Sequence, residues 1–302
     1  MPPAASPRVV PTGLIVSPQG RRYTRAVPAQ QIASNLAFIN WTVLTGLAVG
    51  AYGVALLTRW RTAATPGFVR FTTICALAFG VLAWFSDGAL PGSLGESPVV
   101  ANADFDGPRR AALALFVVLG AIDLIALRNR PIGRYVGSAA LGAGVLVLMF
   151  GALAWGSGSS VGLLLQLAVL SAATGGVFAA MILGHWYLVT PKLPEAPLVL
   201  VSRLLLAVIA VQVALFAVWI ATGAGPAQVA PFAALTGSWA FFVWMRLIIG
   251  LIFPLIVSYA AIQTARTRSM ESATGLLYIN VGTIAAGTIL AAGLYFGAGL
   301  LV

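Results

Sequence analysis

Charged residues are scarce in this sequence. Asp, Glu, Lys and Arg make up 8% of the 302 residues, whereas soluble domains carry roughly 25%. The mean hydropathy is +0.98, and the apolar residues fall into runs of about 20, the length of a helix that crosses a bilayer. A membrane β-barrel would instead show alternating segments of about ten residues. The composition therefore excludes an ordinary soluble domain and predicts an all-α, polytopic bundle of transmembrane helices.

Residues that bind metals are also nearly absent. The chain has one cysteine, Cys75, and one histidine, His185, which excludes an intrachain disulfide, a cysteine cluster and bis-histidine haem ligation. Met181 precedes His185 by one turn of the same predicted helix, so it cannot supply the opposite axial ligand of a haem. The sequence contains no Walker A, GxSxG or HExxH pattern. We therefore predict no metal, no catalytic residue and no resident cofactor, and an enzyme is the less favoured class.

Basic residues outnumber acidic ones by 17 to 7, which gives a net charge of +10. Nucleic acid is not the predicted partner, because the arginines stand at the ends of apolar runs, where they anchor helices and set topology. Nine basic residues flank the spans on one side of the predicted bundle: Arg59, Arg61, Arg70, Arg128, Arg130, Arg134, Lys192, Arg266 and Arg268. The loops of the other side carry only Arg109 and Arg110, although the N-terminal tail adds four arginines to that side. The positive-inside rule then predicts a cytoplasmic-membrane protein whose two termini lie outside.

The chain divides into a tail and a membrane domain. Residues 1–30 contain six prolines and four arginines and no acidic residue, which predicts a disordered tail. Residues 31–302 form the predicted helical membrane domain. Its eight expected spans are roughly 34–57, 68–90, 111–127, 134–155, 162–189, 196–222, 232–264 and 273–300.

Two segments suggest an internal repeat. "VLTGLAVGAYGVALLTRW", residues 43–60, aligns without a gap with "VLSAATGGVFAAMILGHW", residues 169–186, and five of the eighteen positions are identical. The alternative is chance similarity between helices rich in Ala, Gly and Leu. A real repeat would join two parallel four-helix halves, 34–155 and 162–300, related by an axis along the membrane normal.

Small residues recur at helical spacing within the aligned segments. They are Ala172, Gly176, Ala180 and Gly184 in the second segment, with Gly46 and Gly50 at matching positions in the first. Small residues four apart allow helix backbones to approach closely in lipid. We therefore assign these six positions to helix packing and not to chemistry.

Ionisable residues within apolar runs indicate where a site could lie, because they cost several kcal/mol in a membrane unless they find partners or water. Arg246, in "FFVWMRLIIGLIFP", is the strongest candidate, since it lies near the middle of the predicted span 232–264. It needs a carboxylate, carbonyl groups or a bound anion. Pro254, eight residues later, is expected to kink the helix and free a carbonyl.

Five other residues lie at comparable depths near the basic side of their spans: Asp123, Arg203, His185, Asn280 and Tyr278. Together with Arg246 they are the candidates for a substrate site or a proton path. The alternative is that each pairs separately or extends toward the interface. Asp87 is expected at the outer end of its span, in contact with water.

Three functions fit these observations. The first is a transporter or permease for a small molecule or ion, with a polar site around Arg246. The second is a quinone-interacting or accessory subunit of a membrane redox complex, in which His185, Trp186 and Tyr187 would contact the quinone. The third is a structural or assembly subunit without a small-molecule site. The expected partners are the lipid bilayer and either other membrane subunits or further copies of this chain.

Overall fold

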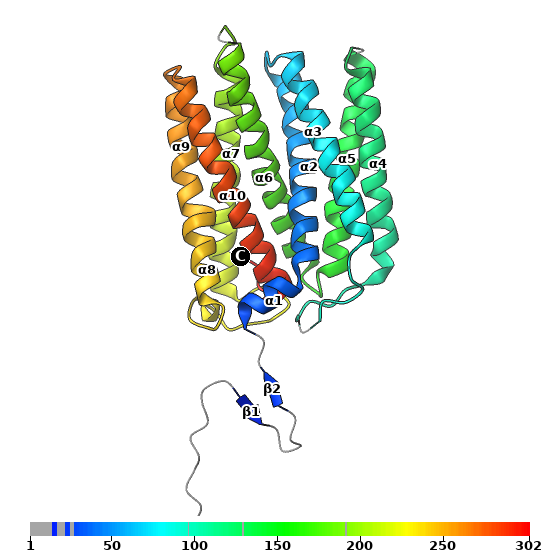
Figure 1. Ribbon diagram of the computed structural model, residues 1–302, viewed down its shortest axis with the longest axis vertical. Helices are drawn as coiled ribbons and strands as arrows, with labels where there is room; N and C mark the ends of the chain where they lie inside the picture. Colours follow the sequence, from blue (N-terminus) through cyan, green and yellow to red (C-terminus); the bar gives the residue numbers. More distant parts are fainter. Residues whose placement is uncertain (1–13, 17–21, 25–26, 96, 129, 191) are drawn as a thin grey trace, which may run out of the picture.

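Long apolar helices dominate the structure, a computed structural model that describes residues 14–16, 22–24, 27–95, 97–128, 130–190 and 192–302 (Figure 1). Seven of the helices in these ranges are long and apolar enough to cross a membrane. They are α2 (Leu36–Arg61), α3 (Pro66–Gly88), α5 (Arg130–Trp155), α6 (Ser160–Val189), α7 (Ala196–Thr222), α8 with η4 and α9 (Ala240–Leu247, Ile248–Ile252, Phe253–Arg266), and α10 (Met270–Ala298). The predicted helical membrane bundle is thereby confirmed.

The helix α4 (Asp106–Ile125) corresponds to the predicted third span. It is 20 residues long and packs along α3 and α5 within the same bundle (Figure 1). It is not among the seven apolar spans, and its sequence includes four charged residues, Asp106, Arg109, Arg110 and Asp123. Two of these charges, Arg109 and Asp123, are buried and therefore need partners inside the bundle, as described below.

Short elements complete the described chain. They are β1 (Leu14–Val16), β2 (Arg22–Thr24), α1 (Pro28–Ser34), η1 (Ala103–Phe105), η2 (Ala126–Arg128) and η3 (Ala233–Leu235). The two strands pair antiparallel, with Ile15 opposite Tyr23. Most of the predicted tail, residues 1–30, lies outside the described residues, so its predicted disorder stays a prediction.

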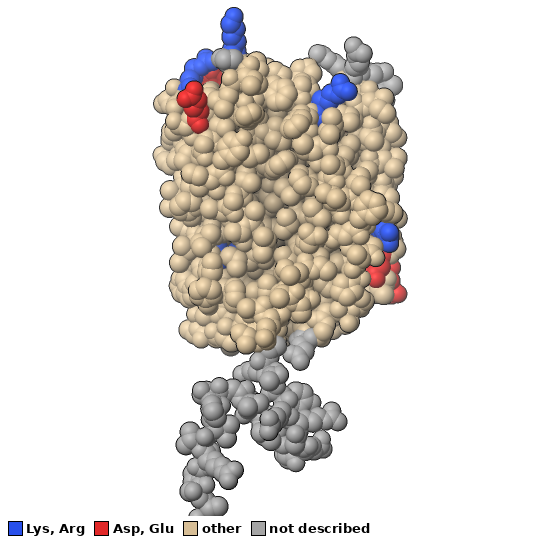
Figure 2. All heavy atoms as spheres, viewed as in Figure 1, with Lys and Arg blue, Asp and Glu red and all other residues tan. Residues whose placement is uncertain are grey.

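The bundle has two chemically different ends. One end, here called the basic end, carries the turns that join α2 to α3, α4 to α5, α6 to α7 and α9 to α10 (Figure 1). Figure 2 shows lysine and arginine side chains gathered there, above a broad uncharged belt. The other end, here called the terminal end, carries α1 and residues 299–302. Both described ends of the membrane domain thus lie on the same side of the bundle, as an even number of crossings requires.

Local sequence explains where the helices begin and end. Thr65 caps α3, because its hydroxyl accepts a hydrogen bond from the amide of Phe68 (3.3 Å) and Pro66 occupies the first turn. Gly223 and Gly299 end α7 and α10 in the left-handed conformation, with φ of 66° and 67°. The seventh span is shorter than predicted: residues 232–239 form η3 and turns, and the helix begins only at Ala240.

The helices pack as two groups of four. In the first group α2 packs on α3, α3 on α4, and α4 on α5. In the second, α6 packs on α7, α7 on α9, α9 on α10, and α10 on α6. The helices α2 and α6 join the groups at the centre, where α5 also packs on α6 and α10 on α2 (Figure 1). Each group thus contributes its first and last helices to the boundary between them.

Glycine backbones make the closest contact between α2 and α6. A Cβ atom on Gly50 would overlap the carbonyl of Ser171, and one on Gly175 would overlap the backbone of Gly50 and Ala51. A Cβ atom on Gly46 would lie 3.4 Å from the Cα of Ser171. Small residues therefore allow the two central helices to touch along their backbones.

The other small residues that we assigned to packing face different neighbours. A Cβ on Gly184 would lie 2.8 Å from the hydroxyl of Thr274 on α10, whereas one on Gly176 would meet only Leu205 of α7, at 3.9 Å. Ala180 is buried and Ala172 is half-buried. Among the glycines of α6, Gly175 therefore makes the tightest backbone contact with α2, one residue before the predicted packing residue Gly176.

Aromatic side chains and the last residues of the chain fill the terminal end. Trp41 and Trp155 pack edge to face with ring centroids 4.7 Å apart, and Phe296 packs against Trp155. Residues 300–302 are buried, and the amide of Val302 donates a hydrogen bond to Oε1 of Gln166 (3.4 Å).

Candidate functional site

Arg246 is buried between α7, η4 and α10, with 2% of the residue exposed. Its Nη2 donates to Oε1 of Gln212 on α7 (2.6 Å), and its Nη1 donates to the carbonyl of Gly250 (3.0 Å). Gln212 in turn donates through Nε2 to the carbonyl of Val169 on α6 (3.1 Å). A chain of hydrogen bonds therefore links Arg246 to the central helix α6.

Pro254 explains why the Gly250 carbonyl is free to accept. In a regular helix that carbonyl would accept from the amide of residue 254, but proline has no N–H. The backbone there forms the π-helical segment η4, Ile248–Ile252, a rare turn that interrupts the regular hydrogen-bond ladder of an α-helix. The guanidinium of Arg246 takes the place of the missing donor. The carbonyl that Pro254 was expected to free is therefore that of Gly250, and it accepts a hydrogen bond from Arg246.

Glycines leave room for the guanidinium. A Cβ on Gly287 of α10 would lie 2.8 Å from Nη1 of Arg246 and 2.6 Å from the Cα of Gly250. The backbones of η4 and α10 therefore meet beside the arginine.

Arg246 lies six residues after the start of α8, about 9 Å along the helix, so it is closer to the terminal end than to mid-span.

The charge of Arg246 has only neutral partners. Among the described residues, no carboxylate forms an ion pair with it, and its Nε is enclosed without a hydrogen-bond partner. A buried cation without a counter-charge carries a large desolvation cost. Arg246 is therefore a position where a bound anion would be stabilised.

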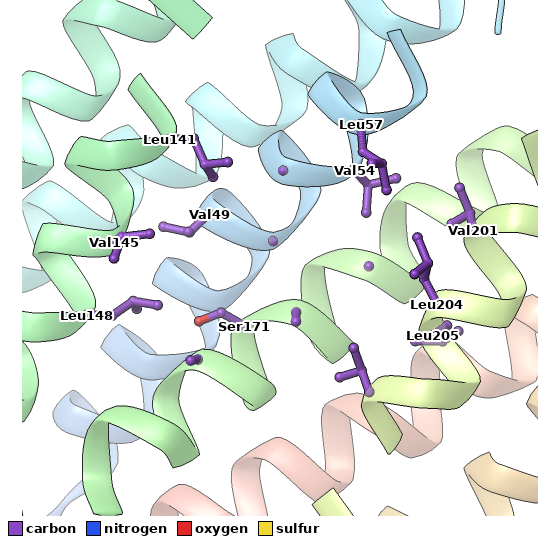
Figure 3. A pocket seen from close by; sticks show the side chains of 16 residues that line it. Val49, Val54, Leu57, Leu141, Val145, Leu148, Ser171, Val201, Leu204 and Leu205 are labelled. Atoms are coloured by element: carbon purple, nitrogen blue, oxygen red, sulfur yellow. The ribbon is translucent and has the colours of Figure 1, made fainter. Parts of the chain in front are cut away.

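An apolar groove opens on the bundle surface where the two helix groups meet (Figure 3). Its volume is about 360 Å³, and it is lined by α2 and α5 on one side and α6 and α7 on the other. Among the described residues of this lining, Ser171 has the single polar side chain. Val145 and Leu204, which are 53% and 40% exposed, stand in its lining, so the groove is open toward the lipid.

The groove approaches Arg246 through Gln212. Val208, which lines the groove, precedes Gln212 by one turn of α7, and Ala168 of the groove adjoins Val169, whose carbonyl binds Gln212. One helical turn is about 5.4 Å. One end of the groove therefore lies about one helical turn from Gln212, the residue that binds Arg246.

Asp123 forms a separate polar cluster near the basic end. Its Oδ1 pairs with Nη1 of Arg59 and its Oδ2 accepts from the hydroxyl of Tyr52, both at 2.9 Å. Asp123 is 1% exposed, and a Cβ on Gly137 of α5 would lie 3.2 Å from its Oδ2. The arginine and tyrosine come from α2, so this cluster fastens α4 to α2 within the first helix group.

The other candidates do not join either cluster. Arg203, His185 and Tyr278 are exposed on the outer surface of the bundle. Asn280 is fully buried and donates to the hydroxyl of Ser258 (2.7 Å) and to the carbonyl of Pro254 (3.5 Å), which fixes α10 to α9. The six residues considered together from the sequence thus lie in at least three separate places.

The three residues considered for quinone contact also differ in their surroundings. His185 is exposed, and Trp186 packs near Phe71 of α3, with ring centroids 6.4 Å apart. The hydroxyl of Tyr187 donates to the carbonyl of Pro194 (2.5 Å) and accepts from the amide of Leu198 (3.4 Å). Tyr187 therefore holds the turn between α6 and α7.

Asp87 is not in contact with water as expected, but buried. Its Oδ2 accepts from Nε of Arg109 (2.6 Å) and from the indole of Trp41 (2.9 Å). Arg109 also pairs with Asp106 (2.8 Å) and lies 4.5 Å from the ring centroid of Trp155. The sequence signal for this cluster was an acid at the end of one span and an arginine at the start of the next.

Comparison with known proteins yields no match to a family model, to a curated protein or to a solved structure. What the chain does must therefore be inferred from its own geometry.

Proposed function

We propose that this integral membrane protein is a transporter or permease for a small, largely apolar solute that carries one anionic group. The observation that supports this most directly is the uncompensated charge of Arg246 beside the end of an apolar groove. The groove would admit the apolar part of the solute from the lipid. Arg246 and Gln212 would bind its anionic group.

Both parts of this site are suited to such a solute. A volume of about 360 Å³ lies within the range of small-molecule sites, about 300–1,000 Å³. An anion that displaced Gln212 from Arg246 would gain a charge-assisted, two-pronged contact in a low-dielectric setting. Gln212 would then be the side chain that moves when the solute binds.

The arrangement of helices supports the internal repeat as part of this proposal. The order of packing in α2–α5 matches that in α6–α10, and the boundary between the groups is formed by equivalent helices. In both groups an arginine of the third helix binds a side-chain oxygen of the second: Arg109 with Asp87, and Arg246 with Gln212. In transporters built from repeats, substrates bind at the interface between the halves, which move against each other. The groove lies at that interface.

Uptake into proteoliposomes tests this proposal. Benzenesulfonate and octanesulfonate are suitable labelled probes, because sulfonates stay ionised and do not leak through lipid as neutral acids. We expect uptake by the wild-type protein, and a loss of about tenfold or more for Arg246→Gln, since a charge-assisted contact is removed. Arg203→Gln, which changes an exposed arginine of α7, is the matched control and should transport normally.

A second change tests the groove itself. Ala172 is half-buried and lines the groove, so Ala172→Phe would fill it without changing any charge. We expect this variant to lose uptake of both sulfonates, because the apolar part of the solute can no longer enter the groove. Equal uptake by the wild-type protein, Arg246→Gln and Ala172→Phe would contradict the transport proposal.

A quinone-interacting role is the second candidate, because the groove is apolar and open to lipid, as an isoprenoid tail would need. It predicts that quinone is extracted in stoichiometric amount from the purified protein and is lost in Ala172→Phe. His185→Ala should lower quinone content only if the head group reaches His185. Absence of quinone together with absence of sulfonate uptake would favour a structural or assembly role.

A further inference from the structure

A second cavity, here called the basic pocket, lies at the basic end of the bundle and shares no described lining residue with the groove. Its volume is about 750 Å³. The described lining comes from α2, the turn after α2, α3, η2 and α5, and it includes Arg59, Arg134 and Trp60 together with the apolar residues Pro66, Val69 and Leu127. It includes two arginines and no acidic residue. Charge and apolar surface therefore face the same space.

Arg59 is held in a fixed position at the wall of this pocket. Its Nη1 is bound to Asp123, which Tyr52 also contacts, so the guanidinium is oriented from behind. Its Nη2 is enclosed and has no hydrogen-bond partner among the described residues. A Cβ on Gly133 of α5 would collide with this nitrogen, so the glycine leaves the space that Nη2 occupies. Arg59 thus retains an unused donor.

Arg134 supplies a second charge at the same pocket. It is exposed, its guanidinium carbon lies 6.0 Å from the ring centroid of Trp60, and it forms no ion pair with a described residue. Asp123 neutralises Arg59, but nothing in the described lining neutralises Arg134. The pocket therefore has a net positive charge, with the exposed guanidinium of Arg134 as a forked donor and that of Arg59 at its wall, a combination that suits phosphate oxygens.

We propose that the basic pocket binds a phosphate-bearing anion, with the phosphate between Arg59 and Arg134. The position of the pocket at the end of the spans, beside Trp60 and an apolar wall, fits the headgroup of an anionic lipid, whose chains would follow Val69 and Leu127. A soluble phosphate compound would offer the same oxygens to the same arginines. The phosphate group is the common chemistry, and experiment distinguishes its source.

Binding to the delipidated full-length protein in a neutral detergent tests the proposal. The probes are dihexanoyl-phosphatidylglycerol, dihexanoyl-phosphatidylcholine and inorganic phosphate, and the readout is the dissociation constant from the ligand-dependent shift in unfolding temperature. Arg134→Gln should weaken binding by about tenfold, because one charge-assisted contact is lost. Arg70→Gln is the matched control, since Arg70 is exposed on α3 at the same end but is not among the described lining residues.

A second variant examines Arg59 without leaving Asp123 unpaired. Arg59→Lys keeps a cation for Asp123 but removes the second prong of the guanidinium, so it should fold and bind phosphate more weakly than the wild-type protein. Binding of phosphatidylglycerol without binding of inorganic phosphate would identify a lipid headgroup, and binding of inorganic phosphate without binding of phosphatidylglycerol would identify a soluble anion. Binding of both would support the phosphate site itself, since both probes offer the same oxygens. Binding of neither probe would overturn the proposal. Equal affinities in wild-type protein and Arg134→Gln, or equal losses in Arg134→Gln and Arg70→Gln, would also overturn it.

Discussion

The clusters around Asp123 and Arg246 both place a charged residue inside the bundle, but they stabilise it differently. Asp123 has a cation, Arg59, and a hydroxyl, Tyr52, each at 2.9 Å. Arg246 has an amide oxygen and a carbonyl, and one of its nitrogens has no partner among the described residues. The first cluster is electrically neutral and the second is not.

This difference separates a structural role from a binding role. A buried ion pair is already neutral, so an anion gains less charge stabilisation from it than from an unpaired cation. A buried cation with neutral partners still gains from any anion that reaches it. The comparison supports a structural role for Asp123, which fastens α4 on α2 and orients Arg59, and it favours Arg246 as the residue for the proposed binding of an anionic solute.

The largest expected effect comes from breaking the neutral cluster. Arg59→Met leaves Asp123 buried without a cation, and losing one partner of a buried pair costs about 3–5 kcal/mol. We expect a value near the lower limit, because the Arg59 side chain is 14% exposed. The measurement is the free energy of unfolding in mixed micelles, with Arg61→Met, an exposed arginine of the same helix, as the control.

A double variant separates the pair from the side chains themselves. Arg59→Met combined with Asp123→Asn removes both charges and keeps an acceptor for Tyr52. It should be more stable than Arg59→Met alone by at least about 1 kcal/mol, since no unpaired charge remains. Asp123→Asn is measured alone as well. If the loss in the double variant equals the sum of the losses in Arg59→Met and Asp123→Asn, the two residues are not coupled and the neutral cluster is not structural.

A smaller loss is expected from the tyrosine of the same cluster. Tyr52→Phe removes one hydrogen bond to a charged acceptor and leaves the ion pair in place, which should cost about 1.5 kcal/mol. Tyr278→Phe is the matched control, because Tyr278 is 50% exposed, and exposed changes usually stay within about 0.5 kcal/mol. Equal unfolding free energies for the two variants would show that the Tyr52 hydroxyl contributes nothing to the fold.

The bundle was predictable because lipid imposes simple rules on the sequence. Apolar runs had to be helices, since only helices and closed barrels satisfy the backbone in a bilayer. The limits of this approach show at 232–239, where an apolar stretch forms η3 and turns at the terminal end instead of extending the helix. Hydropathy does not distinguish an apolar loop packed on protein from a helix in lipid.

The candidate site was only partly predictable. Depth along a span identified Arg246 and Asp123 as buried, but depth gives no information about which side of a helix faces inward. Arg203, His185 and Tyr278 have suitable depths and are nevertheless exposed. Partners such as Gln212 for Arg246 and Tyr52 for Asp123 come from other helices, and that pairing depends on packing that the sequence alone does not give.

The smallest expected effect on stability comes from removing the uncompensated charge of Arg246. Arg246→Gln removes a cation whose burial is costly, which offsets the loss of its hydrogen bonds to Gln212 and Gly250. A glutamine can still donate to one of these acceptors. We therefore expect the free energy of unfolding to change by less than about 1 kcal/mol in either direction, well below the loss in Arg59→Met.

The same variant should lose its response to anions. Benzenesulfonate should raise the unfolding temperature of the wild-type protein, because a ligand that binds only the folded state stabilises it by mass action. It should not raise that of Arg246→Gln, whereas Arg203→Gln should respond as the wild-type protein does. A loss of about 3 kcal/mol or more in Arg246→Gln would place Arg246 with Asp123 as a structural residue, because only a cation whose partners fully compensate its burial is so costly to remove.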